Sequence, residues 1–532
     1  MMGLGRFKLH LVIVFNIVIA LAYYLDNLNA SYSELSSDIQ NIIPVAQKFD
    51  NPKLFKSDLF LDNIENVKYY TPFYVQSLRF IAGFTNHDYV QAINVLGLIC
   101  HLLFGILWFF LFFKFVNNFW IAFLVSIVIR GVIWLPGLEI WGISDLWTIM
   151  PRTVYISLLP LPFLLLSSSS SSYLRIVMSG FVMGFIFNFH PITGLGGILL
   201  FITFIVLIPV YFPKEKWFTW PKFIIVILSV LLGMLPFVLT YFGKTSSEVT
   251  YSIDDFNAAF TTRIPSYFNE PLQFLKQWIH FKTLFFILPL VWFLISSIKN
   301  RVEFQKAKLL ILMTLVLVLI PTISVPVEQL VNRLLGLNLR LSFQLIRVQK
   351  VAVVPGFFAL ALFLKSFFET KKIRAEVLPY LVGVYLVLII FSQSIWFKTI
   401  PFIGDDITKT ILPHNLSAFS TERDNMLSVD KMANYIKKHT EMDDLICASH
   451  LYRGSTQRSV VFDGKGASML IEGNPEQFIT WHNRQQTINE FETMQEVVTY
   501  LKKFNVDYFV TRNKGVPGEL IHTEGSINLY KL

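Results

Sequence analysis

Charged residues are scarce in this chain, and cysteine is nearly absent. Only 15% of the 532 residues are charged, 54% are hydrophobic, and the two cysteines are Cys100 and Cys447. A soluble protein could not bury the long apolar runs that this composition produces, so the sequence predicts a polytopic membrane protein. One cysteine lies in an apolar segment and the other in the more polar C-terminal region. This arrangement excludes a disulfide framework and a cysteine metal site.

The chain also lacks a stripe of basic residues interleaved with aromatic ones. Its net charge of +9 would suit a nucleic-acid partner, but the lysines and arginines stand in short clusters between apolar segments. Membrane proteins carry such clusters in their loops. We therefore expect membrane lipids, and no nucleic acid, among the partners of this protein.

Apolar segments of near-membrane length follow one another through most of the chain. Most are close to the length that a bilayer core requires, although two are short enough to be broken or oblique. The segments are residues 9–25, 91–113, 119–135, 152–167, 175–190, 192–212, 222–242, 281–298, 308–325, 348–365 and 377–397. We predict a mainly α-helical membrane bundle of about eleven spans, formed by residues 1–398.

The charges of the loops predict the orientation of this bundle. Arg6 and Lys8 precede the first apolar segment, and basic clusters at 299–308 and 365–374 fall on the same side of the membrane. Since basic loops stay in the cytoplasm, the N-terminus is predicted to be cytoplasmic. The loop at 26–90 and the C-terminal region are then extracytoplasmic.

From about residue 399 the composition becomes that of a soluble domain. Amphipathic helices alternate there with short apolar strands, which is typical of a small α/β domain. The expected helices are 428–439 and 494–504, and the expected strands are 444–448, 458–462 and 506–510. We predict a soluble extracytoplasmic α/β domain at 399–532.

The loop at 26–90 begins with an amphipathic stretch that carries an acid. Apolar residues from Ile39 to Phe49 follow helical spacing, so residues 33–49 are predicted to lie on the membrane surface with Asp38 in the first helical turn. Asp58 follows in the same loop. Both carboxylates are expected where the membrane meets water.

Three further polar residues stand near span ends on the same predicted face. Arg152 begins one span, Arg347 precedes another, and His190 lies before Pro191 and Gly194, which are expected to break the helix beside a ligand. Placing ionisable side chains within the membrane costs free energy. If the spans bundle, these residues would converge where an enzyme could hold a substrate that is half lipid.

Several short motifs, taken with this architecture, resemble those of the GT-C class of glycosyltransferases. The chain is similar in this respect to protein O-mannosyltransferases, lipid A aminoarabinose transferases and uncharacterised bacterial relatives. The motifs are Ser37-Asp38-Ile39-Gln40, Leu54-Phe55-Lys56-Ser57-Asp58, Pro151-Arg152, His190-Pro191-Ile192-Thr193-Gly194, Gln344-Leu345-Ile346-Arg347 and Arg458-Ser459-Val460-Val461-Phe462-Asp463. The chain lacks the adjacent Asp-Glu pair of the mannosyltransferases and the Trp-Trp-Asp-Tyr-Gly motif of oligosaccharyltransferases.

The resemblance implies transfer of a sugar from a polyprenyl-phosphate donor to a hydroxyl of a glycan, lipid or protein acceptor. The reaction would take place at the outer membrane face, which is periplasmic, extracellular or lumenal, and the bacterial inner (plasma) membrane is the expected location. A partly desolvated carboxylate suits the base that such transfer needs, and Asp38 is the expected base. Asp58 would be the second catalytic acid, either supporting the base or holding a divalent metal. No cofactor is expected, although a divalent metal stays open.

The departing group would be a lipid phosphate, which calls for fixed cations. An arginine fork matches phosphate oxygens, so Arg347 is the first expected phosphate ligand, with Arg152 and His190 beside it. Each residue also has a simpler interpretation. An acid stabilises a helix N-terminus, an arginine near a span end reaches lipid headgroups, and an interfacial histidine packs with satisfied hydrogen bonds.

Two other classes of function stay open at this point. A flippase for lipid-linked sugars or a secondary transporter would need polar groups within its spans, where Arg130 is the main ionisable residue. A non-catalytic membrane assembly or binding protein would keep the same scaffold and tolerate the loss of Asp38.

Overall fold

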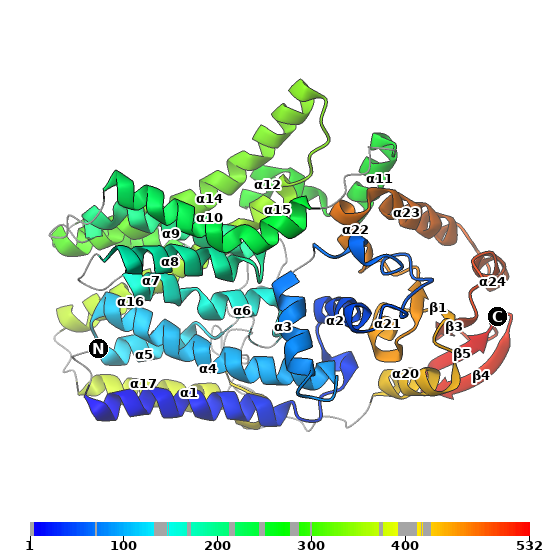
Figure 1. Ribbon diagram of the computed structural model, residues 1–532. Coiled ribbons are helices and arrows are strands. Elements are labelled where there is room, and N and C mark those ends of the chain that lie inside the picture. The colour runs from blue at the N-terminus through cyan, green and yellow to red at the C-terminus, as the bar shows by residue number, and fades with distance from the viewer. Residues whose placement is uncertain are drawn as a thin grey trace. The chain divides into compact units, whose positions relative to one another are not determined.

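The computed structural model describes most of the chain as helix, with one small sheet near the C-terminus (Figure 1). It describes residues 5–69, 72–131, 146, 148–166, 172–211, 219–243, 251–276, 287–297, 301–371, 376–391, 412–416, 418 and 427–532. The chain forms two compact units, each built from separate stretches. Unit 1 comprises residues 1–27, 95–236 and 266–421, and unit 2 comprises 28–94, 237–265 and 422–532. The sequence-based division after residue 398 stays a prediction.

Among the described residues, six helical stretches are long and apolar enough to cross a membrane. This finding supports the prediction of a helical membrane protein. The stretches are α1 (Arg6–Asp26), α4 (Tyr89–Val116), α9 (Pro191–Tyr211), α10 (Trp220–Phe242), α14 (Arg301–Leu335), and the run formed by α15 (Ser342–Leu345), η5 (Ile346–Ala352) and α16 (Val353–Thr370).

Shorter apolar helices occupy the other predicted spans. They are α5 (Phe119–Val128), α6 (Pro151–Leu158), α7 (Pro160–Leu166), α8 (Tyr173–Phe187), α13 (Leu288–Ser296) and α17 (Val377–Ile390). The expected spans at 119–135, 281–298 and 377–397 extend into stretches outside the described residues. The count of about eleven spans is therefore not confirmed and stays a prediction.

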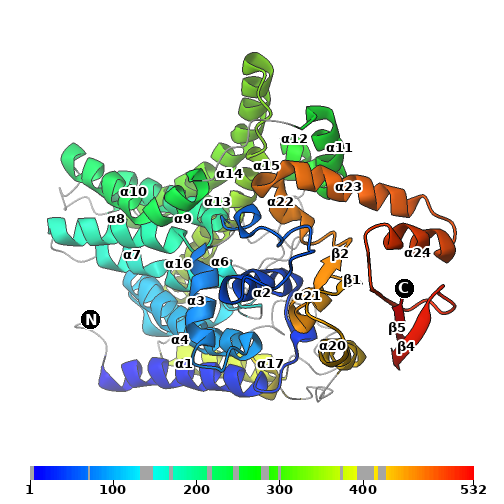
Figure 2. The ribbon, with the colours of Figure 1, turned by 45° about the vertical axis from the view of Figure 1, so that its right-hand side comes forward.

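Unit 1 carries apolar side chains on its surface as well as in its interior. On α10, Leu228 and Leu239 are exposed while Val226 and Val230 are buried, and Ile323 of α14 is exposed. A helix that is apolar on both faces suits a place between protein and lipid. Within the unit, α9 contacts α8, α14 and η5, and Figures 1 and 2 show α8, α9 and α10 side by side.

Unit 2 joins the loop after α1 to the C-terminal region. Its first stretch forms η1 (Tyr32–Glu34), α2 (Ser37–Asp50), η2 (Ile64–Asn66) and α3 (Pro72–Ala82), and its second adds α11 (Ile253–Arg263). The third stretch forms α20 (Ser428–His439), β1 (Leu445–Cys447), α21 (Leu451–Thr456), β2 (Ser459–Val461), α22 (Ala467–Gly473), α23 (Pro475–Asn489), α24 (Met494–Lys502), β3 (Tyr508–Thr511), β4 (Glu519–Glu524) and β5 (Ile527–Lys531). The helices and strands expected in this stretch are confirmed, with ends that differ by a few residues.

The five strands form one mixed sheet in the order β2-β1-β3-β5-β4. β2, β1 and β3 are parallel, whereas β5 pairs antiparallel with both β3 and β4. Figure 2 shows α20 and α21 beside these strands. The sequence predicted three of the strands and missed β4 and β5.

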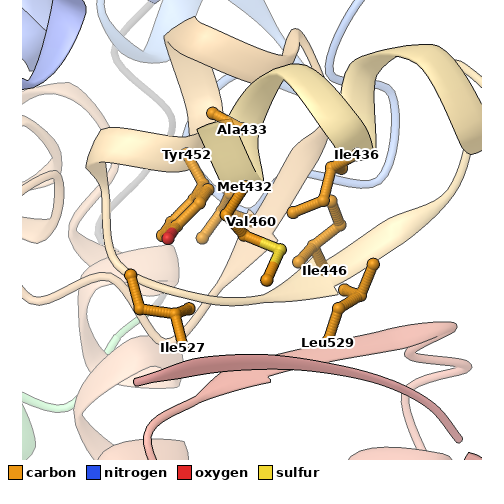
Figure 3. Packing of buried hydrophobic residues seen from close by; sticks show 8 residues of the cluster. All are labelled: Met432, Ala433, Ile436, Ile446, Tyr452, Val460, Ile527 and Leu529. Atoms are coloured by element: carbon orange, nitrogen blue, oxygen red, sulfur yellow. The ribbon is translucent and has the colours of Figure 1, made fainter. Parts of the chain in front are cut away.

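The core between α20 and the sheet follows from the spacing of apolar residues on that helix. Met432, Ala433 and Ile436 lie on one face and are buried, together with Ile446 of β1 and Leu529 of β5. Figure 3 shows Met432 and Ile436 directed toward the side chains of the strands. This packing fixes the C-terminal region as a folded part of unit 2.

The helix expected around Asp38 is present as α2, but its surroundings differ from the expectation. Residues 39–48 of α2 are buried, polar side chains such as Gln47 included. The helix contacts α3 and α21, and Gln47 Nε2 donates a hydrogen bond to the carbonyl of Gly454 at 3.1 Å. The apolar face of α2 is therefore covered by protein within unit 2, and the prediction of a helix lying on lipid was wrong.

Candidate functional sites

The residues expected to act in catalysis and in phosphate binding belong to different units. Arg152, His190 and Arg347 lie in unit 1, whereas Asp38 and Asp58 lie in unit 2. Each group is described here within its own unit.

His190 stands between α8 and α9, outside both helices. Its Nδ1 accepts a hydrogen bond from the backbone N–H of Thr193 at 3.1 Å, so the ring caps the start of α9. A ring nitrogen that accepts in this way carries no proton, which places the proton of the neutral ring on Nε2. Burial, followed by the positive charges of Arg152, Lys350 and Arg347, holds the pKa of His190 well below its usual value. His190 is therefore a neutral donor through Nε2–H.

Arg347 and Lys350 share one face of η5. A 3₁₀-helix has three residues per turn, so side chains at i and i+3 are aligned. Arg347 Nη1 donates to Gln344 Oε1 at 3.0 Å, and its guanidinium lies 5.5 Å from the ring centroid of Phe268. Sequence reasoning selected Arg347 and missed Lys350, although the three-residue spacing was a usable signal.

Two glycines of α9 let the neighbouring elements approach closely. A Cβ atom on Gly196 would lie 2.4 Å from Val351 Cγ2 of η5, and one on Gly197 would lie 1.7 Å from Tyr155 Oη of α6. Because neither position has a side chain, η5 and α6 can pack against the first turns of α9. α6 carries Arg152 in its first turn. The close packing thus gathers positive charges from three elements.

We refer to Arg152, His190, Arg347 and Lys350 as the basic cluster. All three residues expected to bind the donor phosphate belong to it. Their elements α6 and η5 pack against the start of α9, and the charges of the other three residues act on His190. The N-terminus of α9 adds the positive end of its helix dipole. This arrangement can bind an anion.

The turn that leads into η5 is held by two side chains of α14. The carboxylate of Glu328 accepts hydrogen bonds from the backbone N–H groups of Leu341 at 2.6 Å and Ser342 at 2.8 Å. The side chain of Asn332 accepts from the N–H of Leu339 at 2.9 Å and donates to its carbonyl at 3.0 Å. Glu328 therefore stabilises the start of α15, which fixes the path of the chain toward Arg347.

The expected break in the helix is present, because α8 ends at Phe187 and α9 begins at Pro191, but Gly194 does not take part in it. Pro191 begins α9, and Gly194 lies inside that helix. A Cβ atom on Gly194 would lie 2.6 Å from Phe187 Cδ2. Gly194 therefore permits close packing of α8 and α9, and the approach of a ligand to the backbone there stays a prediction.

Arg130, the main ionisable residue expected inside the spans, is buried in a polar network of unit 1. Its Nη2 donates to Asn16 Oδ1 at 2.5 Å and to the carbonyl of His101 at 3.0 Å, and Nη1 lies 3.3 Å from His101 Nδ1. Gly105 leaves room for this network, because a Cβ atom there would meet both Asn16 and Arg130. These bonds join α1, α4 and the end of α5, which favours a structural role.

In unit 2, Asp38 lies in the first turn of α2, as predicted. Ser36 is the N-cap, and its hydroxyl accepts from the backbone N–H of Ile39 at 3.4 Å, so Asp38 is not needed as the cap. Asp38 Oδ1 lies 2.5 Å from Lys465 Nζ, with 24% and 34% of the two side chains exposed. Asp38 is therefore reachable from water.

Asp58 is completely buried. Its Oδ2 accepts from Arg453 Nε at 2.6 Å and from the N–H of Val460 at 3.0 Å, and its Oδ1 accepts from the N–H of Phe60 at 3.0 Å. A general base must reach the proton that it removes. The burial of Asp58 favours a positioning role, and its direct part in catalysis stays a prediction.

Arg453 connects Asp58 to a second buried acid, Asp463, through a bond of 2.6 Å from Nη1 to Oδ2. Burial alone would lower the pKa of Arg453, but the two carboxylates raise it above its usual value. Burial would raise the pKa of Asp463, but Arg453 holds it below the usual value. Arg453 and Asp463 are therefore both charged, and removing one partner from such a buried set costs about 3–5 kcal/mol.

Asp463 in turn holds the loop that carries Lys465. Its Oδ1 accepts from the N–H of Lys465 at 2.7 Å, and its Oδ2 accepts from the N–H of Gly466 at 3.0 Å. A Cβ atom on Gly466 would lie 2.5 Å from Asp463 Oδ2, so only glycine fits there. Phe462 enters the loop with φ 64°. Such a conformation costs a bulky residue about 1–3 kcal/mol.

Two more basic side chains lie near Asp38. Arg263 Nε donates to the carbonyl of Gly464 at 2.9 Å. Burial lowers the pKa of Arg263, and the charge of Asp38 is among those that oppose the shift. Burial also lowers the pKa of His450, with Lys465 adding to the effect. The carboxylate of Asp38 is therefore in contact with Lys465, and its charge acts on Arg263 and His450.

Arg458, which belongs to one of the motifs of the resemblance, has a structural position. Its Nη2 donates to the carbonyls of Lys437 at 3.1 Å and Thr440 at 2.7 Å. These are carbonyls at the end of α20, where an arginine both satisfies free acceptors and complements the helix dipole. Of the residues in this motif, Asp463 and not Arg458 is connected to Asp38, through the loop that carries Lys465.

Within the part of the chain that the structure describes, no group of three or more histidine, cysteine or acidic residues is placed to hold a metal ion. The expectation that no cofactor is needed, and the alternative of a divalent metal, both stay predictions.

No model of a known protein family matches the chain, and no curated protein matches it. The resemblance to GT-C glycosyltransferases therefore rests on the residues and the architecture described above.

Proposed function

We propose that this protein is a membrane glycosyltransferase that moves a sugar from a polyprenyl-phosphate donor to an acceptor hydroxyl. The observation that carries the proposal is the basic cluster of Arg152, His190, Arg347 and Lys350, which forms where α6 and η5 pack against the start of α9 that His190 caps. The first three were selected from the sequence as ligands of a lipid phosphate, and they come from separate parts of the chain. Their convergence supports a site for a phosphate that is attached to an apolar chain.

The chemistry of the basic cluster suits a phosphate that leaves during the reaction. Arg347 offers a planar fork and Lys350 a compact charge, while His190 adds a neutral N–H donor at Nε2. Fixed donors of this kind stabilise the charge that develops on the departing phosphate. Arg152 adds a further positive charge. After its sugar has been transferred, the donor remains as a polyprenyl phosphate.

Asp38 would act on the acceptor in this proposal. Its carboxylate takes the proton of the acceptor hydroxyl, and the hydroxyl oxygen forms a bond to the anomeric carbon of the sugar. The bond between that carbon and the phosphate oxygen breaks, and its electron pair goes to the phosphate. The water-accessible position of Asp38 supports this role, and the buried Asp58 would act through other residues.

The proposed location is a bacterial inner membrane, with the N-terminus in the cytoplasm and unit 2 outside. The basic clusters near residues 299–308 and 365–374 support this orientation. A glycan, a lipid and a protein all fit as acceptors.

The first test measures binding of a short-chain polyprenyl phosphate to the purified protein in nanodiscs. We expect Arg347→Ala to weaken binding by about 10- to 100-fold, the equivalent of about 1.5–3 kcal/mol for a charged hydrogen bond. Arg347→Lys should restore only part of the affinity, because the planar fork is lost. Arg333→Ala, which removes an exposed arginine of α14, is the matched control and should leave binding unchanged.

The second test offers the wild type a panel of polyprenyl-phosphate sugars and acceptors. Asp38→Asn should lower turnover by roughly a hundredfold or more while donor binding is retained. If the Arg347, Arg152 and His190 variants all bind polyprenyl phosphate with wild-type affinity, the basic cluster is not the phosphate site. Full turnover by Asp38→Asn would move the base role to another residue, and absence of transfer by the wild type would favour the non-catalytic alternative.

A further inference from the structure

Unit 2 links the two acids that the sequence singled out through one continuous series of contacts. Asp58 binds Arg453, Arg453 binds Asp463, and Asp463 binds the backbone of the loop that carries Lys465. Lys465 then contacts Asp38 at 2.5 Å. Asp58 and Asp38 are thus the two ends of a connected path.

The two halves of this path differ in exposure. Asp58, Arg453 and Asp463 have side chains that are at most 1% exposed, whereas Lys465 and Asp38 are partly open to water. A buried set of charges that is fully bonded has few alternative arrangements. The inner half can therefore hold the loop still, while the outer half stays accessible to a substrate.

Backbone strain at the entry to the loop that carries Lys465 also indicates that this loop has a functional role. Phe462 has a positive φ, and Gly466 lies where no side chain fits. A partly exposed ion pair such as Lys465 with Asp38 contributes less to stability than such a strained residue costs. The gain in stability from the ion pair does not account for the shape of the loop. Strain that is kept in this way is characteristic of functional sites.

We propose that Lys465 is a positioning residue for Asp38, held by the buried Asp58, Arg453 and Asp463. The lysine holds one carboxylate oxygen of Asp38 and keeps the group ionised and oriented toward the acceptor. This inference rests on the proposed function, because it assigns a task to the same base. It also gives Asp58 its task, which is to hold the residue that orients the base.

A zero-length cross-link tests the contact without any measurement of activity. A carbodiimide activates a carboxylate, and an amine in direct contact displaces the activating group, which leaves an amide bond and a urea. We expect a cross-linked peptide that joins Asp38 to Lys465. The exposed pair of Lys56 and Asp443, at 3.3 Å, is the internal control. Lys465→Gln should lose the first cross-link and keep the second.

The pH dependence of turnover tests the positioning role. The positive charge of Lys465 favours the ionised form of Asp38, so its removal should let Asp38 take up a proton at higher pH. We expect the acid limb of the pH–rate profile to move up by about one pH unit in Lys465→Gln. Lys465→Arg should keep the wild-type profile because it keeps the charge. Lys56→Gln, the matched control, should not shift it.

The outcomes separate this inference from the proposed function. If the wild type transfers no sugar, the proposed function fails, and the positioning role fails with it. If the wild type is active and Asp38→Asn is not, but Lys465→Gln keeps the wild-type profile, only the inference fails. A missing cross-link between Asp38 and Lys465, with the control cross-link present, would also overturn it.

Discussion

His190 and His450 both have pKa values below the usual one, but their surroundings differ. At His190 the charges of Arg152, Lys350 and Arg347 add to the effect of burial. Burial also lowers the pKa of His450, yet the nearby carboxylates of Asp463 and Asp38 oppose the shift. His190 therefore stays a neutral donor, whereas His450 lies among charges of both signs.

The histidine at 450 predicts how stability changes with pH. In the unfolded chain its pKa is about 6.5, and in the folded protein it is lower, so protons bind preferentially to the unfolded state. The buried His450 therefore contributes to the stability of the folded protein above about pH 6.5, and this contribution is lost as the pH falls below that value. We expect the midpoint of thermal unfolding of the wild type to fall from pH 8 to pH 5, and His450→Gln to reduce this fall.

His439→Gln provides the comparison, because His439 lies exposed on α20. That variant should keep the pH dependence of the wild type. Part of the dependence should also remain in His450→Gln, since His190 contributes with the same sign. If the curves of His450→Gln and the wild type run parallel, the burial of His450 does not affect stability.

At the scale of elements, the close approach of η5 to α9 determines whether the basic cluster can form. The contact at Gly196 involves Val348 and Val351, whose branched side chains have few ways to move aside. η5 carries two members of the basic cluster. A single methyl group added at Gly196 should therefore disturb the basic cluster, although Gly196 itself carries no charge.

We expect Gly196→Ala to lower the midpoint of thermal unfolding and to weaken polyprenyl-phosphate binding. The added Cβ would lie 2.4 Å from Val351 Cγ2, so η5 must shift. Gly383→Ala is the matched control in α17, because a Cβ atom at Gly383 would meet nothing within 4 Å. That change should be neutral or stabilising by about 0.5–1 kcal/mol. Equal effects of the two changes would mean that the packing at Gly196 is not important for the site.

The elements that the sequence predicted well are those with a strong local pattern. α20 has its expected bounds because apolar residues such as Met432 and Ile436 recur on one face of a polar helix. β4 and β5 were missed although Gly525, with φ 58°, marks the turn between them. Short strands near a chain end give little periodicity. The burial of α2 could not be predicted either, because its partner α21 lies far along the sequence.

For the whole molecule, orientation in the membrane is the property most directly tested. We expect Lys53→Cys and Lys514→Cys to react with an impermeant thiol reagent added to intact cells, and Lys371→Cys to be protected. All three positions are exposed. The background replaces Cys100 and Cys447 by alanine. All three cysteines should react once the membrane is opened, and labelling of position 371 alone in intact cells would reverse the orientation.

The candidate site was predicted only in part, for a reason that applies to the molecule as a whole. Charge and position near a span end singled out Arg152, His190 and Arg347, which the structure brings together in unit 1. No comparable sequence pattern marked the residues that contact Asp38 and Asp58. Arg453 and Lys465 stand in an ordinary polar stretch, and only the folded unit shows what they contact.

The bond between Asp58 and Arg453 also has a consequence for biogenesis. The two residues are 395 positions apart, so Asp58 is synthesised long before its partner. At 5–20 residues per second the delay is roughly 20 to 80 seconds. During that time α2 has none of the cover that α21 later gives to Gln47 and its neighbours. The apolar face of α2 therefore stays without this cover until the last part of the chain has been translated.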